Sequence, residues 1–323
     1  MRSSVQILVL FSLILFSSCL KEELPVAAHQ EGDFSISQVA MGSDYSQQIY
    51  FNLNDNAVVK QNLKTDWDIA FECSDNGWHV VLNSSLGSAV SNTGLIDFNA
   101  VSSLSGNEQW NNDNPNGDLD STAIGDYRNT NFVYVIDRGY NSQGTQLGYK
   151  KVVFNVVTNQ QYEIRVAELD GSSDVTVSVT KDSTYNFLAF SFNSNSVIEI
   201  EPPKESWDLH FTQYTHIFYN PIMPYLVSGV LLNRNNTQVA VDSESEFQLI
   251  SYDLLQQYDF SEHLNTIGYD WKSYDFNTSL YAVDQEKNFI IKNSIGLYFK
   301  LHFIDFYNDS GEKGYPKFAL QQL

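Results

Sequence analysis

The feature that most constrains the fold of this chain is an internal repeat at an offset of 140 residues. Residues 65–71 read Thr-Asp-Trp-Asp-Ile-Ala-Phe, and residues 205–211 read Glu-Ser-Trp-Asp-Leu-His-Phe. The same ungapped register extends upstream to the pair Val39 and Val179, over about thirty residues. Chance similarity around one Trp-Asp dipeptide does not hold its register that long, so the sequence predicts two related structural units.

A second block of the repeat fixes where the two units begin and end. It consists of two segment pairs, 131–135 with 288–292 and 149–154 with 298–303. A period this long indicates duplicated domains rather than a solenoid of short repeats. We therefore predict module 1 over residues 34–172 and module 2 over residues 173–323, with the turn-rich sequence Asp-Gly-Ser-Ser at 170–173 between them.

The local pattern within each module is that of strands and turns. Aromatic residues make up 14% of the chain, and these side chains favour the pleated, half-buried surface of a sheet. Residues 151–157 are rich in β-branched and aromatic residues, and residues 162–166 alternate apolar and polar side chains. The prediction is an all-β fold with antiparallel connections. Only residues 243–254 and 261–268 show helix-like spacing.

The charge of the chain excludes one class of partner. Lys and Arg number 18 against 39 Asp and Glu, which gives a formal net charge of −21. Such a field repels phosphate backbones, so nucleic acid is excluded as a partner. The sequence also contains no His-Glu-x-x-His, no Gly-x-Ser-x-Gly and no phosphate-binding glycine loop. We therefore expect a binding protein and not an enzyme.

The N-terminus is typical of an exported lipoprotein. One basic residue, Arg2, precedes a short apolar run over residues 5–16, and small residues then lead to Cys19. This order predicts a signal peptide over residues 1–18 and lipidation of Cys19. An ordinary signal peptide with an incidental cysteine is the alternative. The lipid anchor would be the only attachment to the membrane.

The residues after Cys19 predict where the anchored protein faces. Residues 21–23 read Lys-Glu-Glu, similar to the surface-export signal of lipoproteins in some Gram-negative lineages. The alternative is a hydrophilic tether that carries no export signal. We expect residues 19–33 to form a lipidated tether and the protein to lie on the outer membrane, facing the cell exterior.

Four motifs of module 2 resemble, in order, those of the HmuY-like haem-binding lipoproteins. They are the segments 207–215, 229–233, 267–272 and 303–308. Module 1 resembles the family more loosely, so the resemblance suggests two tandem copies. It implies a β-rich surface protein that captures haem b, alone or from a haem-carrying host protein. It also implies delivery to a TonB-dependent outer-membrane receptor.

The resemblance also directs attention to axial iron ligands, which in haem proteins are commonly His or Met. The founding member of the family is known for two histidines, between the Trp-Asp strand and the final strand pair. In module 2 this window holds His216, Met223 and His263, and these are the candidate haem ligands. No histidine follows Trp271 directly, so a bis-histidine site does not carry over residue by residue. In module 1 the window offers only His79.

Two further expectations accompany the haem hypothesis. Because the chain is strongly acidic, the haem propionates need a nearby cation, and Lys272 and Arg234 are the first candidates. His210 and His302 alternate within strands and are expected to be structural. The competing hypothesis is a surface adhesion or glycan-binding lipoprotein that keeps the same scaffold without haem ligation.

Overall fold

Strands dominate the part of the chain that the structure, a computed structural model, describes, namely residues 30–323. Twenty strands and six short 3-10 helices occur there, and residues 31–323 form one compact unit. The predicted all-β class is therefore confirmed. Within these residues no helix has the length and apolar character needed to cross a membrane. The predicted signal peptide and Cys19 lie outside the described residues.

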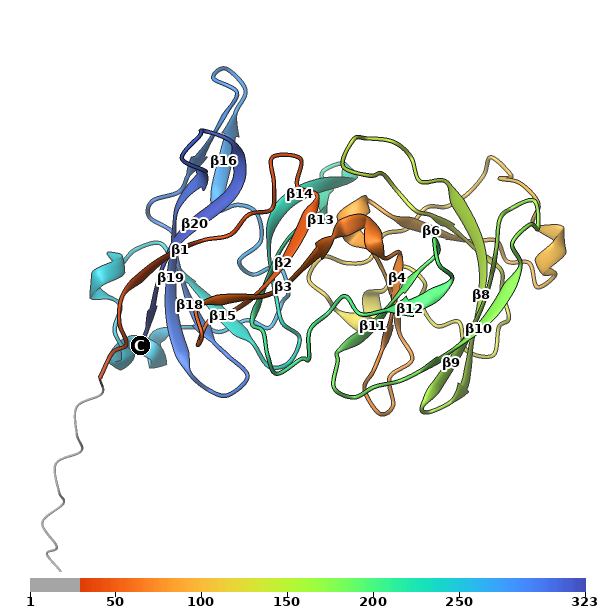
Figure 1. The fold of residues 1–323 in the computed structure, drawn as a ribbon, viewed down its shortest axis with the longest axis horizontal. Helices are drawn as coiled ribbons and strands as arrows, with labels where there is room; N and C mark the ends of the chain where they lie inside the picture. Colours follow the sequence, from red (N-terminus) through yellow and green to blue (C-terminus); the bar gives the residue numbers. More distant parts are fainter. Residues whose placement is uncertain (1–29) are drawn as a thin grey trace, which may run out of the picture. The chain divides into compact units, whose positions relative to one another are not determined.

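Two antiparallel sheets form what we call the C-terminal β-body (Figure 1). The five-stranded sheet has the order β1 (Ser35–Gln38), β20 (Lys313–Gln322), β19 (Tyr298–Tyr307), β18 (Asn288–Lys292) and β15 (Gln238–Asp242). The four-stranded sheet has the order β14 (Ile222–Leu232), β13 (Leu209–Tyr219), β2 (Gln47–Asn52) and β3 (Ala57–Leu63). The first strand thus lies beside the last one.

Two more sheets form the N-terminal β-body with the same pattern. The five-stranded sheet has the order β10 (Val175–Thr180), β9 (Gln161–Ala167), β8 (Tyr149–Thr158), β7 (Tyr134–Asp137) and β6 (Ala89–Asn92). The four-stranded sheet has the order β12 (Ser196–Ile198), β11 (Phe187–Ser191), β4 (Ile69–Glu72) and β5 (Val80–Leu82). A separate hairpin joins β16 (Lys272–Asp275) to β17 (Leu280–Val283).

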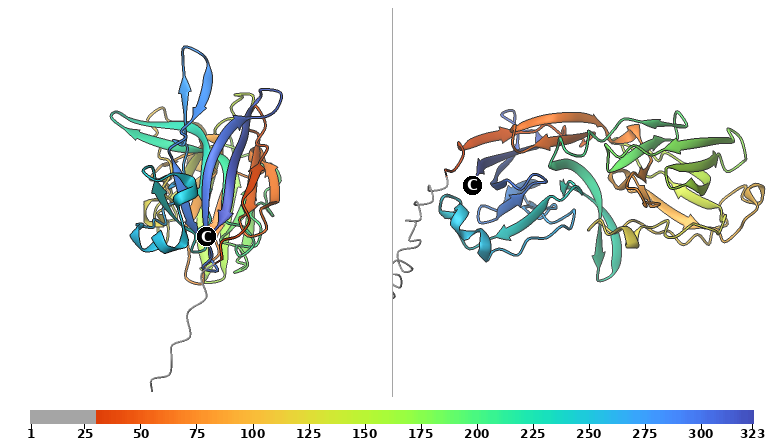
Figure 2. Two further views of the ribbon diagram at one scale, coloured as in Figure 1. Left: turned by 90° about the vertical axis from the view of Figure 1, so that its left-hand side faces the viewer. Right: turned by 90° about the horizontal axis from the view of Figure 1, so that it is seen from below.

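Each β-body combines strands from both sides of residue 172. The strands β10 to β12, which follow it in the sequence, pair with β9 and β4 of the N-terminal β-body. The strands β1 and β2 pair with β20 and β13 of the C-terminal β-body. The module boundary between residues 172 and 173 stays a prediction. The chain passes from the strands of one β-body to those of the other near residues 64–68 and again near residues 199–208 (Figure 2).

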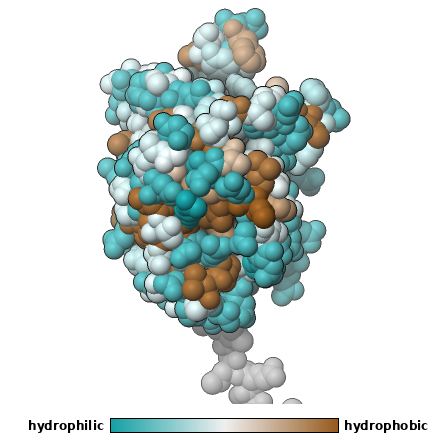
Figure 3. Space-filling view, turned by 90° about the vertical axis from the view of Figure 1, so that its right-hand side faces the viewer, coloured by the Kyte–Doolittle hydropathy of each residue, from teal (hydrophilic) through white to brown (hydrophobic). Residues whose placement is uncertain are grey.

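The two largest hydrophobic cores among the described residues follow the same division. One core joins buried residues at positions 39–53 with buried residues at positions 209–320, and its rings Phe211 and Phe318 stack at 5.5 Å. The other core contains buried residues from Ile69 to Phe192. Burial of these side chains is the main favourable contribution to folding. At one end of the molecule, apolar patches lie scattered among hydrophilic side chains, as on most soluble proteins (Figure 3).

The aspartates of the two Trp-Asp segments each accept a hydrogen bond from a backbone amide of another segment in their β-body. The Asp68 carboxylate accepts a hydrogen bond from the Phe192 amide at 2.6 Å, and the Asp208 carboxylate accepts one from the Leu53 amide at 2.7 Å. Asp68 also contacts a cation, Arg138, whose Nε lies 2.7 Å from its Oδ1, and no cation among residues 30–323 pairs with Asp208. Both copies of the repeat therefore keep the hydrogen bond from a backbone amide to the aspartate, but only the first copy pairs the aspartate with a cation.

The two helix-like segments of the sequence take other conformations. The side chain of Asp242 accepts hydrogen bonds from the Glu244 and Ser245 amides, so the chain turns there. Only 3-10 turns follow, at η5 (Phe247–Leu249) and η6 (Tyr252–Gln257). Residues 261–268 form no helix, because they run along the sheet and make isolated bridges to Val239 and Val230.

Candidate ligand-binding site

The longest hairpin of the molecule carries an exposed apolar tip. Strands β13 and β14 pair over eleven residues each, and contact with β2 covers only the first three residues of β13. The tip therefore extends past the neighbouring strand. Ile222 is 76% exposed and Met223 46%. The other large exposed side chains there are Phe218, Tyr219 and Tyr225.

Four side chains share one face of this hairpin. His216 lies opposite Tyr225, and Phe218 lies opposite Met223, two positions along both strands. Because side chains alternate between the faces of a strand, all four point to the same side. The His216 and Phe218 rings lie 4.8 Å apart, and the Tyr269 ring lies 4.9 Å from His216. We call these five residues the hairpin face.

The surroundings of the His216 ring determine its protonation state and its hydrogen bonding. Its Nδ1 is buried and has no hydrogen-bond partner among the described residues. Burial lowers the pKa of His216, and the nearby Asp270 carboxylate opposes this only in part. The imidazole is therefore neutral near pH 7, which is the form that binds metals.

The three predicted haem ligands do not lie together. Met223 is the diagonal neighbour of His216 on the hairpin face, where Cβ atoms are typically about 7–8 Å apart. His263 is exposed, and its neighbour Leu264 accepts a hydrogen bond from the Leu232 amide. Leu232 lies seven positions along β14 from Tyr225, so roughly 20 Å separates His263 from His216. The structure brings together His216 and Met223 but not His263.

A second exposed apolar element, the β16–β17 hairpin, is attached to β14. Lys272 begins β16, and its Nζ donates a hydrogen bond to the Ser228 carbonyl of β14 at 2.6 Å. Further out on this hairpin Phe276 is 88% exposed. The stretch after Trp271, in which the resemblance led us to look for a second histidine, forms β16 and the turn that follows it, and it contains no histidine.

Neither predicted propionate partner lies free at the hairpin face. Lys272 is buried, packs 4.2 Å from the Trp271 ring, and has a pKa lowered to about 7 by burial. Arg234 lines a separate cavity and donates a hydrogen bond to the Gly117 carbonyl. Lys287 is a cation near the hairpin face, with its Nζ 2.8 Å from the carboxylate of Asp270, the residue after Tyr269.

The remaining histidines have structural environments. The Nδ1 of His79 lies 2.5 Å from the Glu72 carboxylate, and its ring stacks on Trp78. The Nδ1 of His302 lies 3.0 Å from the Asn288 side-chain oxygen. His210 was expected to be structural, and its ring stacks on that of its cross-strand partner Tyr50 at the wall of a second cavity. Residues 30–323 contain no cluster of three or more His, Cys, Asp or Glu suited to a metal ion.

Sequence reasoning found His216 and Met223 but missed their aromatic neighbours. Tyr225 joins the hairpin face because it pairs with His216 across the two strands. Tyr269 lies in a loop much further along the chain and reaches the hairpin face only through its ring contact with His216. Alternation within 213–225 could have indicated Phe218 and Tyr225. No local signal indicates Tyr269, because its contact depends on the tertiary fold.

Comparisons with known proteins give the family context. The family model described as HmuY protein matches residues 44–320 as one continuous span. The crystal structure of an apo HmuY analogue from Tannerella forsythia is 12% identical and covers 91% of this chain and 98% of its own, with a TM-score of 0.35. Apo PinO from Porphyromonas gingivitis is 10% identical and covers 90% and 97%, with a TM-score of 0.36. No curated protein matches the chain.

Proposed function

Because the chain belongs to the HmuY family, with the family model matching residues 44–320, we propose that it captures haem b or a related porphyrin. We place the site at the hairpin face. The observation that carries this placement is a neutral His216 whose Nδ1 has no hydrogen-bond partner among residues 30–323, beside Met223 and among exposed aromatic rings. Such a group is otherwise unfavourable, because an unsatisfied buried polar atom costs about 1–3 kcal/mol.

The chemistry of the hairpin face suits a flat, metal-containing ligand. Histidine nitrogen and methionine sulfur are common axial ligands of haem iron. Phe218, Tyr225 and Tyr269 offer aromatic area on which the porphyrin can be buried, which contributes affinity independently of ligation. In this proposal His216 supplies one axial ligand, and Met223 is the neighbouring sulfur donor. His263 takes no part, since it lies far along β14 from the hairpin tip.

We further propose that the protein acts as a lipid-anchored capture protein at the cell exterior and not as an enzyme. The order of residues 1–23, with Cys19 after a short apolar run, supports anchoring in the outer membrane through acylation of Cys19. Family membership supports haem, or a haem-carrying host protein, as the partner, and a TonB-dependent outer-membrane receptor as the recipient. The acidic net charge supports the absence of nucleic-acid binding.

A visible absorption titration of residues 20–323 with haemin tests the proposal. We expect the haemin Soret band to sharpen and shift, with one equivalent of haemin bound. His216→Ala is expected to weaken binding about tenfold or more, which corresponds to about 1.4 kcal/mol. Residual binding by the aromatic rings should remain.

His263→Ala is the matched control, since it removes an exposed histidine away from the hairpin face. It should leave the titration unchanged, whereas Met223→Ala should weaken it if the axial pair is mixed. Two results contradict the proposal. One is a wild-type protein that causes no spectral change under oxidising or reducing conditions, which would favour the adhesion or glycan hypothesis. The other is a loss in His263→Ala that equals the loss in His216→Ala.

A further inference from the structure

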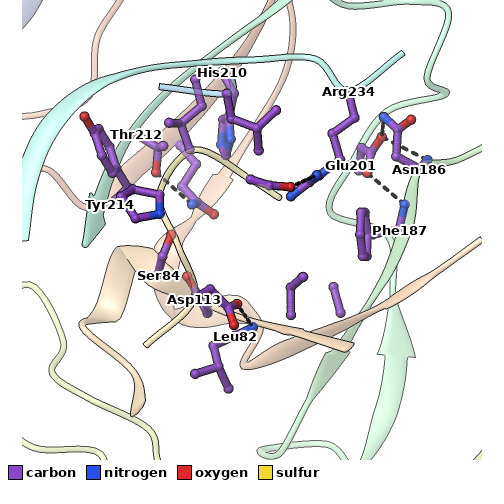
Figure 4. Close-up of a pocket in the computed structure, with 18 of the residues that line it drawn as sticks. Leu82, Ser84, Asp113, Asn186, Phe187, Glu201, His210, Thr212, Tyr214 and Arg234 are labelled. Carbon is purple, nitrogen blue, oxygen red and sulfur yellow. Dashed lines mark hydrogen bonds between the residues drawn. The ribbon is translucent and has the colours of Figure 1, made fainter. Parts of the chain in front are cut away.

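A second, separate cavity, partly open to solvent, lies between the four-stranded sheets of the two β-bodies (Figure 4). Its volume is about 160 Å³. The loop over residues 113–118 covers one side of it. This cover fits closely, because a Cβ atom at Gly117 would collide with the Leu264 side chain. None of the hairpin-face residues lines the cavity, so it is independent of the proposed haem site.

Aromatic side chains form one wall of this cavity. The Tyr50 and His210 rings are stacked at 4.2 Å, with planes only 6° apart. Trp207 packs edge-on against Tyr50 at 5.0 Å. Phe187 also lines the cavity, and its ring centre lies 5.3 Å from the Arg234 guanidinium carbon. A flat apolar molecule would therefore find several aromatic side chains to pack against.

The polar lining carries more negative than positive charge. Asp113 accepts one hydrogen bond each from the Leu82 and Ala123 amides, both at 2.7 Å. Glu201 accepts hydrogen bonds from the Asn186 amide and side chain and from the Phe187 amide. A third carboxylate, Asp118, lines the cavity but is exposed to solvent, so Arg234 is the one cation beside the two less exposed carboxylates.

His210 does not balance this charge. Burial lowers its pKa to about 3, so the ring is neutral. The same burial raises the pKa of Glu201 to about 7 and that of Asp113 to about 6. At least one of these partly buried carboxylates therefore has no cationic counterpart, which is unfavourable where access to water is restricted.

We propose that this cavity binds a small organic cation with a flat apolar body about the size of a benzene ring. A cavity of about 150 Å³ in another protein accommodates benzene, so the volume sets the size of the ligand. The second carboxylate and the Tyr50 and Trp207 rings favour a cation over a neutral or anionic ligand. A porphyrin is too large for this space, so failure of haem binding would not affect this inference.

Calorimetric titration of residues 20–323 with three matched probes at pH 8 tests the inference. The probes are benzylamine, benzyl alcohol and benzoate, which share the ring and differ in charge. Benzylamine is expected to bind about tenfold more tightly than benzyl alcohol, and benzoate not measurably. Equal binding of benzylamine and benzyl alcohol, or binding of none of them, would overturn the inference.

A variant that fills the cavity tests whether benzylamine binds there. Ala189 is buried and lines it, so Ala189→Leu should abolish benzylamine binding, while His263→Ala should leave it intact. If Ala189→Leu does not fold, a crystal of the wild-type protein soaked in benzylamine provides the same test. Ring density between Tyr50 and Phe187 with the ammonium group near Asp113 is expected. Binding retained in the filled variant, or density elsewhere, would overturn the inference.

Discussion

Replacing Asp208 by asparagine should stabilise this protein, although it removes a buried group from a repeated motif. Asp208 is 3% exposed, and its carboxylate accepts a hydrogen bond from the Leu53 amide. No cation pairs with it among the described residues, in contrast to Asp68, which Arg138 contacts. An asparagine oxygen can accept the same hydrogen bond without carrying a buried charge.

The magnitude follows from the pKa of Asp208. Burial raises this pKa from 3.8 to about 6. Well below pH 3.8 the group is protonated in both the folded and the unfolded state, so it costs nothing. The cost develops as pH rises from 4 to 6, and above pH 6 it is about 3 kcal/mol. Subtracting about 1 kcal/mol for the weaker hydrogen bond of an amide leaves a gain of about 2 kcal/mol for Asp208→Asn at pH 8.

Urea unfolding at pH 4, 6 and 8, followed by circular dichroism, measures this directly. The gain in Asp208→Asn should be present at pH 8 and absent at pH 4. Asp68→Asn is the matched variant, and it should lower the free energy of unfolding by about 3–5 kcal/mol because it leaves Arg138 buried without its partner. The reasoning is refuted if Asp208→Asn destabilises the protein at pH 8, or if its effect does not depend on pH.

Three further predictions concern the backbone, the β-bodies and the anchor. Gly139 and Gly144 both have positive φ, but only a Cβ at Gly139 would collide with the Leu86 carbonyl. Thermal unfolding should therefore show Gly139→Ala to be several kcal/mol less stable and Gly144→Ala only about 1 kcal/mol; equal losses would argue against the collision. A fragment of residues 67–203 should fold cooperatively, because it contains β4 to β12, whereas residues 173–323 lack β1 to β3 and should not; cooperative unfolding of the second fragment would refute this. Cys19→Ala should move the protein from the membrane fraction to the soluble fraction, and persistent membrane attachment would exclude the lipid anchor.

The strands were predictable from the sequence, but their partners were not. Alternation at residues 162–166 and the β-branched run at residues 151–157 correspond to β9 and β8. The repeat could not show that β10 pairs with β9 or that β1 pairs with β20. Because the two copies have similar strands, the same hydrogen bonds can form within a copy or between copies. Which of these forms is decided by the tertiary fold.

The two candidate sites differ in the same way. His216 and Met223 lie seven residues apart on one hairpin, so a window search of the sequence finds both. Asp113, Glu201 and Arg234 come from three distant segments and meet only when the two four-stranded sheets and a covering loop come together. The sequence around each is an ordinary turn or strand end. Their charge is informative only once their burial is known.

The position of iron in crystals grown with haemin tests the central claim most directly. Data collected at the iron absorption edge locate the metal without any assumption about the ligands. The proposal predicts one anomalous peak at the hairpin face, within bonding distance of the His216 ring and with the porphyrin against Tyr225 and Tyr269. A peak at His263, at His79 or elsewhere in the N-terminal β-body, or haemin absent from crystals grown with an excess of it, would contradict the claim.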